Sequence, residues 1–534
     1  MMKRIFSIIT FTGLVLFLFT TPASSQKVND ETIKIGGILG LIDRYYVDSA
    51  DLGSLTEKAV IEILKNLDPH STYISAKDVK DMNEPLYGNF EGIGIQFNLL
   101  HDTIIIIEPI AGGPSEKVGL KAGDRILTID KEKVTGVGIN TSGVRRRLMG
   151  AKGTKVDISV LRRGVKDSLD FTIVRDKIPI FSLDASYMLN KETGYIKLNK
   201  FAATTEKEFS EAVAALRKNN MQNLVLDLRG NGGGYMLAAT ALADKFFTDQ
   251  NLLVYISGKN TPRQDHNSRG NGILSSSRVV VLTDEGSASA SEILAGAFQD
   301  WDRAVIMGRR TFGKGLVQNG FELADGSMIR LTIARYYTPT GRSIQSTYED
   351  GYEKYMENFY KRFTDGEMIS ADSTHFLDSL KYKTLRNKRT VYGGGGIMPD
   401  VFVAIDTSFN SAYFRKLAGK NILNSFALEY FDKNRTTLTS TYKKFEDFKD
   451  KFSYSTDDIK SFIAKGEAEG VAYDEAQFNI SKDEILLILK GLVASNIWQV
   501  SEYFQIINQN DNVIDRAVKV ISDSKEYNSI LGYK

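Results

Sequence analysis

Residues 278–299 read RVVVLTDEGSASASEILAGAFQ, and this stretch decides the fold because it predicts a strand, a tight turn and a helix in succession. The run 278–283 is short, apolar and β-branched, while 292–299 places its apolar residues at helical spacing. The small residues of 286–292 lie on the turn between them. Such a turn exposes a hydroxyl beside the unpaired amides of a helix N-terminus, where developing negative charge is favoured.

Ser289 in this turn and Lys314 in the segment TFGKGLVQ (311–318) predict a Ser-Lys dyad. A serine hydroxyl is a poor nucleophile until a base removes its proton, and an amine acts as that base only when it is neutral. The pKa of a lysine must fall from about 10.4 by roughly three units, or about 4 kcal/mol, for this purpose. Apolar neighbours of Lys314 can exclude water and supply the shift. The alternative for 286–292 alone is a Ser/Ala-rich helix cap.

The histidines do not predict a Ser-His-Asp triad, which needs a histidine oriented by a carboxylate. None of the four lies in a glycine-rich context, and we interpret each as a surface or capping residue. They are His70, His101, His266 and His375.

Two glycine-rich motifs resemble nucleotide-binding loops, but each has the wrong residue at a position that such a loop requires. The segment 308–314, GRRTFGK, matches a phosphate loop, but Gly315 stands where Ser or Thr should hold magnesium, and the residues that follow predict a hairpin around Asp325-Gly326. A second glycine cluster follows the apolar strand 223–228, and Tyr235 occupies its third fingerprint position.

The second cluster, RGNGGG, is better explained as a loop of amide donors. Glycines let main-chain N–H groups approach a reacting carbonyl closely. We predict that Gly233, or its neighbour Gly232, shares an oxyanion hole with the amide of Ala290. A plain glycine-rich turn at a strand end is the alternative.

With these motifs the chain resembles the carboxyl-terminal processing (tail-specific) proteases, serine peptidases with a crotonase-like core. The resemblance runs from about residue 30 to about residue 405. Its motifs are LDPHSTY (67–73), a PDZ-like segment, GYIKLNKF (194–201), LDLRGNGGG, GSASASE with AGAFQD, GRRTFGKGLVQ and GIMPD (396–400). It implies an α/β fold: a ClpP/crotonase-like protease core with a PDZ domain and helical N- and C-terminal regions.

The resemblance also implies roles for single residues. Ser289 would be the nucleophile, Lys314 the base, and Gln318 the group that orients the lysine. Supporting roles are implied for Glu292, Asp300 and Thr311, and neither a metal nor a cofactor is implied. Gly232 replaces the proline usual in the glycine loop, which leaves open the amide that faces the oxyanion.

The PDZ-like segment can also be interpreted from its residues. FEGIGIQF (90–97) puts small residues before an alternating strand, a second strand is predicted at 103–108, and GLKAGDRILTID (119–130) leads into a third. A glycine loop of this kind can present amides to a free carboxylate while the adjoining strand pairs with a peptide. The candidate substrate-binding residues are Gly92, Ile93, Gly94 and Ile95. An unrelated small β domain is the alternative.

Residues 1–25 predict a signal peptide, because Lys3 and Arg4 precede an apolar run and small residues precede a cut before Gln26. The apolar run is too short to favour a stable span. The chain has no cysteine, hence no lipid attachment site and no disulfide. We therefore expect an exported, periplasmic protein, with membrane association through an uncleaved anchor as the alternative.

The chain divides into the signal peptide, an N-terminal helical segment (27–88), a PDZ domain (89–176), the protease cap and core (177–405) and a C-terminal helical region (406–534). A helical surface insertion is predicted within the core at 349–389. The net charge of +2, from 68 basic and 66 acidic residues, gives no electrostatic case for nucleic-acid binding.

The sequence thus predicts a secreted or periplasmic serine endopeptidase that recognises the free C-terminal tails of proteins or peptides. Two alternatives remain: a catalytically silent PDZ scaffold on the same fold, and a crotonase-fold enzyme acting on thioesters. The apolar face of residues 485–504 would pack on the core or, alternatively, form a homodimer interface. The sequence does not decide whether the protein acts together with an adaptor protein.

Overall fold

The computed structural model describes residues 29–270, 272–374 and 376–533. The predicted signal peptide lies outside these residues. The chain divides into two compact units, one ending at Ile63 and one beginning at Leu64. Within the described residues, every helix is too short or too polar to cross a membrane.

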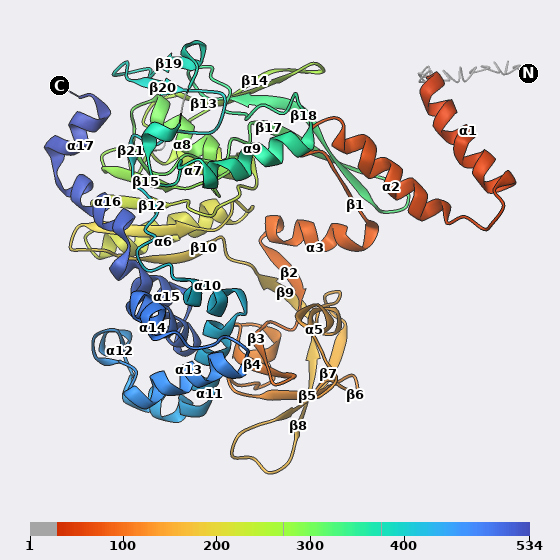
Figure 1. Ribbon diagram of the computed structural model, residues 1–534, viewed down its shortest axis with the longest axis vertical. Helices are drawn as coiled ribbons and strands as arrows, with labels where there is room; N and C mark the ends of the chain where they lie inside the picture. Colours follow the sequence, from red (N-terminus) through yellow and green to blue (C-terminus); the bar gives the residue numbers. More distant parts are fainter. Residues whose placement is uncertain (1–28, 271, 375, 534) are drawn as a thin grey trace, which may run out of the picture. The chain divides into compact units, whose positions relative to one another are not determined.

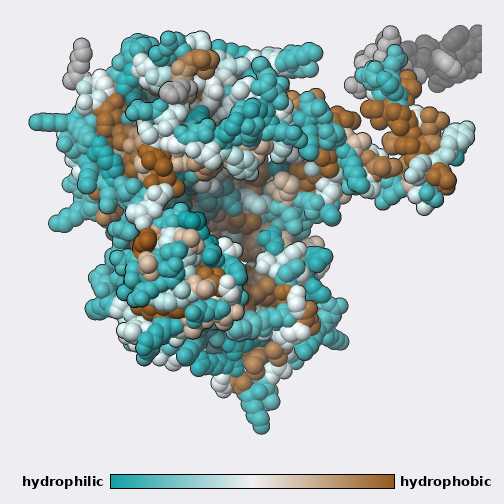
Figure 2. All heavy atoms as spheres, viewed as in Figure 1, coloured by the Kyte–Doolittle hydropathy of each residue, from teal (hydrophilic) through white to brown (hydrophobic). Residues whose placement is uncertain are grey.

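The first unit consists of helix α1 (Asp30–Tyr45) and most of helix α2 (Leu52–Lys65). Asn29 caps α1 by accepting a hydrogen bond from the Thr32 N–H at 2.9 Å. No residue of α1 is buried. Apolar side chains gather on its exposed surface (Figure 2), among them Ile33, Ile35, Ile38 and Leu41.

The second unit is built around a six-stranded sheet in the order β10-β11-β12-β15-β16-β21 (Figure 1). The five strands from β11 to β21 are parallel, and β10 is an antiparallel edge. The predicted strands at 223–228 and 278–283 are confirmed as β12 and β15. The bounds are β10 (Leu183–Met188), β11 (Thr193–Leu198), β12 (Asn223–Asp227), β15 (Val279–Thr283), β16 (Val305–Gly308) and β21 (Val401–Phe402).

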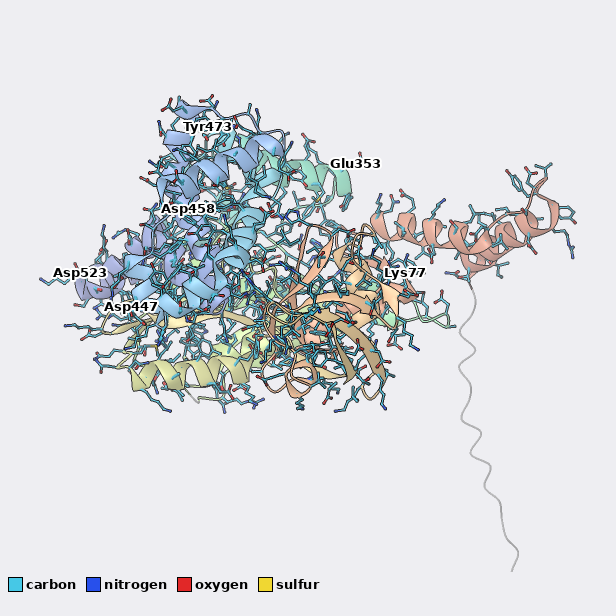
Figure 3. All side chains as sticks on the ribbon, turned by 90° about the horizontal axis from the view of Figure 1, so that it is seen from below. Lys77, Glu353, Asp447, Asp458, Tyr473 and Asp523 are labelled. Carbon is cyan, nitrogen blue, oxygen red and sulfur yellow. The ribbon has the colours of Figure 1, made fainter. Side chains whose placement is uncertain are left out.

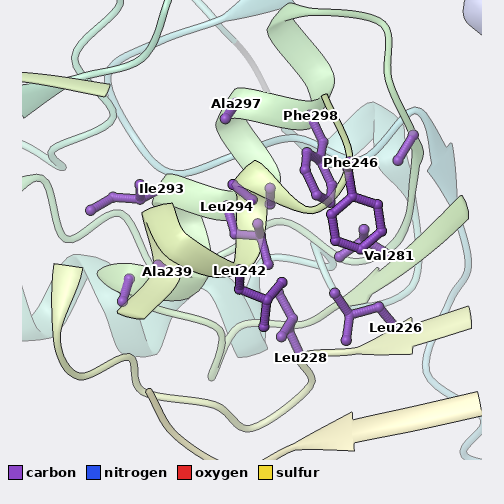
Figure 4. Packing of buried hydrophobic residues seen from close by; sticks show 14 of the residues in the cluster. Leu226, Leu228, Ala239, Leu242, Phe246, Val281, Ile293, Leu294, Ala297 and Phe298 are labelled. Carbon is purple, nitrogen blue, oxygen red and sulfur yellow. The ribbon is translucent and has the colours of Figure 1, made fainter. Parts of the chain in front are cut away.

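Helices cover both faces of this sheet, because alternate residues of a strand point to opposite faces. Leu226 packs against α6 (Thr205–Lys218), α7 (Met236–Asp244) and α8 (Ala290–Asp300). Figure 4 shows this layer, in which the rings of Phe246 and Phe298 lie 4.8 Å apart.

The opposite face of the sheet is covered from the far end of the chain. Val225 packs against α16 (Asn512–Ser522) and α17 (Ser524–Leu531). The last helices of the C-terminal region therefore complete the hydrophobic core of the sheet.

A second sheet has five strands, of which two come directly after the Lys314 segment. Strands β17 (Leu316–Glu322) and β18 (Met328–Tyr337) form the predicted hairpin, with Gly326 at φ 82° in its turn. Because a strand and not a helix follows 308–314, the phosphate-loop interpretation is excluded. The other strands are β1 (Thr72–Ile74), β13 (Leu252–Gly258) and β14 (Thr261–Asn267).

The PDZ region is a small sheet with two helices and its own apolar core, to which Ile104, Ile126 and Ile158 contribute. Strand β2 (Asn89–Gly92) pairs with β9 (Asp176–Pro179), and helix α3 (Ala76–Tyr87) precedes β2. The remaining elements are β3 (Ile95–Leu100), β4 (Thr103–Pro109), α4 (Pro114–Lys117), β5 (Arg125–Ile129), β6 (Glu132–Lys133), α5 (Thr141–Leu148), β7 (Lys155–Leu161) and β8 (Leu169–Val174).

Six helices of the C-terminal region enclose a separate aromatic core. Ile485, Leu489 and Val493 of the predicted apolar face are buried in it, whereas Phe504 at the end of that face packs against the core sheet. Figure 3 marks Asp447 on α12 and Asp458 on α13. The helices are α10 (Ala412–Gly419), α11 (Ile422–Thr441), α12 (Phe445–Lys451), α13 (Thr456–Ala468), α14 (Glu475–Ile497) and α15 (Val500–Ile507).

Among its described residues, the insertion at 349–389 contains one α-helix, α9 (Tyr352–Thr364). Two short 3-10 turns follow, and then strands β19 (Lys381–Lys383) and β20 (Thr390–Tyr392), which pair with each other. The insertion is not confined to the surface, because Arg362 is buried and pairs with Glu367 at 2.8 Å.

A buried ion pair at the end of α8 offers a test of the core. Arg342 lies 2.7 Å from Asp300, and both side chains are fully buried. Arg342→Met leaves an uncompensated buried carboxylate, so we expect the unfolding free energy of the protein to fall by about 3–5 kcal/mol. The measurement is urea denaturation followed by tryptophan fluorescence. Lys207→Met is the control, since Lys207 forms an exposed pair with Glu211 worth less than about 0.5 kcal/mol; equal losses would contradict the prediction.

Candidate active site

Ser289 stands at the junction of β15 and α8 in a strained conformation, with φ 55° and ψ −114°. A non-glycine residue at such angles costs about 1–3 kcal/mol and persists only where its surroundings hold it. Gly233 allows this turn to fit, since a Cβ at Gly233 would lie 2.8 Å from the Cβ of Ser289 and 2.9 Å from the Ala290 amide nitrogen. Ser289 is half-buried, whereas Ala288 and Ala290 on either side of it are buried.

Lys314 lies in the segment that leads into β17. Burial lowers the pKa of its ammonium, and the nearby positive charge of Arg330 lowers it further. Glu292 and Asp68 oppose this shift through their negative charges. Because the pKa falls below its usual value, a larger share of Lys314 is neutral at a given pH, as a general base requires.

Glu292 joins the main chains of the serine turn and the lysine segment. Its Oε2 accepts from the N–H of Ser289 at 2.8 Å and from the N–H of Lys314 at 2.9 Å. Its Oε1 accepts from the Thr311 hydroxyl at 2.6 Å and from the Gly313 N–H at 2.7 Å. The carboxyl is fully buried, and burial raises its pKa to about 7 although all four donors favour the ionised form.

Tyr336 makes a second link between the two segments. Its hydroxyl lies 2.5 Å from the carbonyl oxygen of Lys314 and 3.2 Å from that of Ser289. Within the described part of the chain no hydrogen bond joins Ser289 Oγ to Lys314 Nζ. Catalytic hydrogen bonds are often long in the free enzyme and shorten when substrate binds.

Gln318 accepts a hydrogen bond from Lys314 Nζ through Oε1 at 3.1 Å. Its Nε2 donates to the main-chain carbonyl of His70, which fixes the orientation of the amide. The loop that carries His70 is held in turn by Asp68, whose carboxylate accepts from the His70 N–H at 2.8 Å and the Ser71 N–H at 2.9 Å.

His70 is the residue at this site that the sequence interpretation misplaced. It is neither a surface nor a capping residue: burial and the charge of Lys314 lower its pKa to about 4, and its Nε2 lies 3.2 Å from the hydroxyl of Tyr355 in α9. The motif LDPHSTY was the available signal, since Asp68 two residues before a histidine predicts a fixed loop.

The three predicted amide donors differ in whether they have an acceptor. The Gly233 N–H already donates to the Asn231 side chain at 2.9 Å. The N–H groups of Gly232 and Ala290 have no acceptor among the residues that the structure describes. Of the three predicted amide donors, Gly232 and Ala290 are therefore the pair free to hold an oxyanion.

Thr311 and Asp300 occupy supporting positions away from the serine hydroxyl. The Thr311 hydroxyl accepts from the Ile397 N–H at 2.6 Å while it donates to Glu292, so it links the GIMPD segment to the serine turn. Asp300 ends α8 and accepts from the N–H and hydroxyl of Thr340 at 2.9 and 2.8 Å. In the described ranges, no group of three metal-ligating side chains converges here or elsewhere.

The PDZ region carries a cavity of about 540 Å³ between β3 and α5. Ile93, Gly94, Ile95 and Phe97 line it, whereas Gly92 pairs with Asp176 and does not. The carbonyls of Ile93 and Gly94 accept from Ser115 and Ile110, but their N–H groups have no acceptor within the described residues. The cavity therefore offers free amides and apolar walls together.

Three family models match the chain. One is peptidase family S41 at residues 192–352, one is the PDZ domain at 92–173, and one is a family of unknown function at 413–499. The first two cover the site and the cavity described above.

Curated relatives match over most of their own length. A carboxy-terminal-processing protease of Bartonella bacilliformis is 34% identical, over 62% of this chain and 76% of that protein. The carboxy-terminal processing protease CtpB of Bacillus subtilis is 35% identical, over 61% and 68%. Among solved structures, a photosystem II D1 C-terminal processing protease is 30% identical with a TM-score of 0.33, over 60% of this chain and 91% of that one.

Glu292→Gln tests the link between the two segments. The glutamine side chain would point an NH₂ donor at main-chain N–H groups, leaving buried donors unpaired at about 1–3 kcal/mol each. We expect kcat for peptide hydrolysis to fall by about ten- to a hundredfold. Glu285→Gln is the matched control, because the Glu285 carboxylate pairs with Arg309 and accepts from neither the Ser289 N–H nor the Lys314 N–H within the described residues. Full activity of Glu292→Gln would show that the link is dispensable.

Proposed function

The chain belongs to the carboxy-terminal processing proteases, serine peptidases of family S41 with a PDZ domain, and we propose that it hydrolyses peptide bonds with a Ser289–Lys314 dyad after capturing the C-terminal tail of its substrate. The observation that carries the dyad is the single Glu292 carboxylate oxygen that accepts from the N–H groups of both residues. The free amides and apolar walls of the PDZ cavity support the capture step.

In the acylation step, neutral Lys314 takes the proton of the Ser289 hydroxyl as the oxygen attacks the peptide carbonyl carbon. The oxyanion of the tetrahedral intermediate accepts hydrogen bonds from the N–H groups of Gly232 and Ala290. Lys314 then gives the proton to the leaving amine, which departs with the C-terminal fragment. Gln318 keeps the ammonium directed at the serine by accepting from Nζ.

In the deacylation step, water attacks the ester carbonyl of the acyl-enzyme, and Lys314 removes a proton from that water. The same two amides hold the second oxyanion. Lys314 returns the proton to Ser289 Oγ as the ester bond breaks, which releases the new C-terminus and restores the resting enzyme. The reaction requires only groups of this chain and one water molecule.

We propose that this reaction takes place in the periplasm after export by the signal peptide. The substrates would be proteins or peptides with free C-termini. An adaptor and a homodimer remain compatible with this function, and neither is needed for the chemistry.

The proposed dyad predicts how peptide hydrolysis is lost in single and double variants. We expect Ser289→Ala and Lys314→Ala each to abolish peptide hydrolysis, and the double variant to be no worse than either, because residues that act as one unit lose their function together. Lys314→Arg should fail as well, since a guanidinium stays protonated in this pH range. Initial rates on a fluorogenic peptide measure this.

Lys207→Ala is the control for loss of an exposed lysine. Substantial hydrolysis by Lys314→Ala at neutral pH would refute the dyad. Inactivity of the unmodified protein towards both peptides and a fluorophosphonate probe would favour a catalytically silent scaffold.

Tail capture predicts that the terminal charge of the substrate matters. Amidation of the C-terminus weakens a charge-assisted contact with the amides of Ile93 and Gly94, worth roughly 1.5–3 kcal/mol. Cleavage at subsaturating substrate should therefore slow by about one to two orders of magnitude. Apolar terminal residues should be preferred, because Ile93, Ile95 and Phe97 line the cavity.

Matched free-acid and amide peptides measure this effect through initial rates. A pair that differs only by N-terminal acetylation is the control and should be cleaved at equal rates. Equal rates for acid and amide would remove the PDZ cavity from substrate recognition and leave the dyad untouched.

A further inference from the structure

Glu84 is a buried carboxylate on the wall of the PDZ cavity. It comes from α3, outside the PDZ sheet, and lines the cavity together with Phe90, Ile93 and Leu148. Only 5% of its surface is exposed. Neither carboxylate oxygen accepts a hydrogen bond of normal geometry from any residue that the structure describes. A buried charge in that condition is unfavourable unless a partner compensates it.

The charges around Glu84 leave it under-compensated. Lys80 Nζ lies 3.8 Å from Glu84 Oε1 and 3.6 Å from Glu91 Oε2, so one ammonium faces two carboxylates. Lys80 is also half exposed to water, which weakens its attraction. Burial raises the pKa of Glu84 although Lys80, Arg145 and the Glu91 main-chain N–H act to lower it, and Asp81 adds to the rise.

The helix that carries Glu84 is fixed in place at its C-terminal end. The Ala203 N–H donates to the Leu86 carbonyl at 2.9 Å, and the Ile180 N–H donates to the Gly88 carbonyl at 2.9 Å. The main chain next to Glu84 is therefore held beside the cavity. A ligand that reaches it meets a carboxylate among apolar side chains, in a cavity that the cationic side chains of Arg145 and Lys200 also line.

We propose that Glu84 binds the cationic side chain of a lysine or arginine close to the C-terminus of the substrate tail. Apolar walls suit the methylene stem of such a side chain, and the carboxylate suits its charged head. This inference rests on the proposed capture of tails in the PDZ cavity, and it names a preferred class of tail. The cationic residue would add to the apolar preference at the terminal position, because the two contacts use different parts of the cavity.

The test measures binding to the full-length Ser289→Ala protein, which cannot consume the peptide. Fluorescein-labelled peptides carry a free C-terminus, an apolar last residue and either lysine or norleucine at one of the four preceding positions. Norleucine keeps the stem of lysine and lacks its charge. Fluorescence anisotropy should show that lysine lowers Kd by about ten- to a hundredfold at one of these positions, the range expected for a hydrogen bond to a charged group.

Two further variants in the same background assign the effect. Glu84→Gln keeps the size of the side chain and should reduce the preference for lysine to less than about twofold. Glu91→Gln is the matched control, because Glu91 shares Lys80 with Glu84 but does not line the cavity, and it should keep the preference. Thermal unfolding of both variants checks that the fold is intact.

The outcomes separate this inference from the tail-capture proposal. If free-acid peptides bind better than their amides but lysine and norleucine bind equally at every position, the role of Glu84 is refuted and tail capture stands. A preference for lysine that survives in Glu84→Gln also refutes it. If no peptide binds, or acid and amide bind equally, both proposals fall.

Discussion

The site depends on one buried carboxylate. Ser289 lies in a strained turn after β15, and Lys314 lies in a segment that must first pass through β16 and return. The chain between these two residues does not by itself fix their positions relative to each other. Glu292 fixes these positions by accepting hydrogen bonds from both of their N–H groups and from two more donors beside Lys314. The four hydrogen bonds offset much of the cost of burying the charge, and the same burial brings its pKa to about 7.

Helix α3 connects the two places where a substrate would be held. Glu84 lines the PDZ cavity, and Asn83 accepts a hydrogen bond from the Arg330 side chain at 2.9 Å. Arg330 belongs to β18, and its charge lowers the pKa of Lys314. Glu84 of the cavity wall and Asn83, which holds the Arg330 side chain, are thus neighbours on a single helix.

Local signals predicted the parts of the site that are close in sequence. The strand, turn and helix around Ser289 and the hairpin after Lys314 each follow from periodicity and turn residues, and both are observed. The position of His70 could not be predicted in this way, since 248 residues separate it from Gln318. Likewise, no pattern in the glycine loop indicates that the Asn231 side chain occupies the Gly233 amide. These contacts depend on how distant segments pack, and residue spacing does not encode that packing directly.

The C-terminal helices show the same limit and also bear on the site. The periodicity of an amphipathic helix predicts that one face of the helix is apolar, but it does not predict which surface covers that face. Here α16 covers the second face of the core sheet, and Asp511, which caps α16, pairs with Arg229 at 2.8 Å. Arg229 also pairs with the fully buried Asp227 at 2.7 Å and stands directly before the glycine loop. Removing α16 would therefore expose one face of the sheet and take away one of the two carboxylates that hold Arg229 beside the loop that carries the Gly232 amide. The end of the chain is thus part of the structure around the proposed oxyanion donors, although it lies more than 200 residues from Ser289 in sequence.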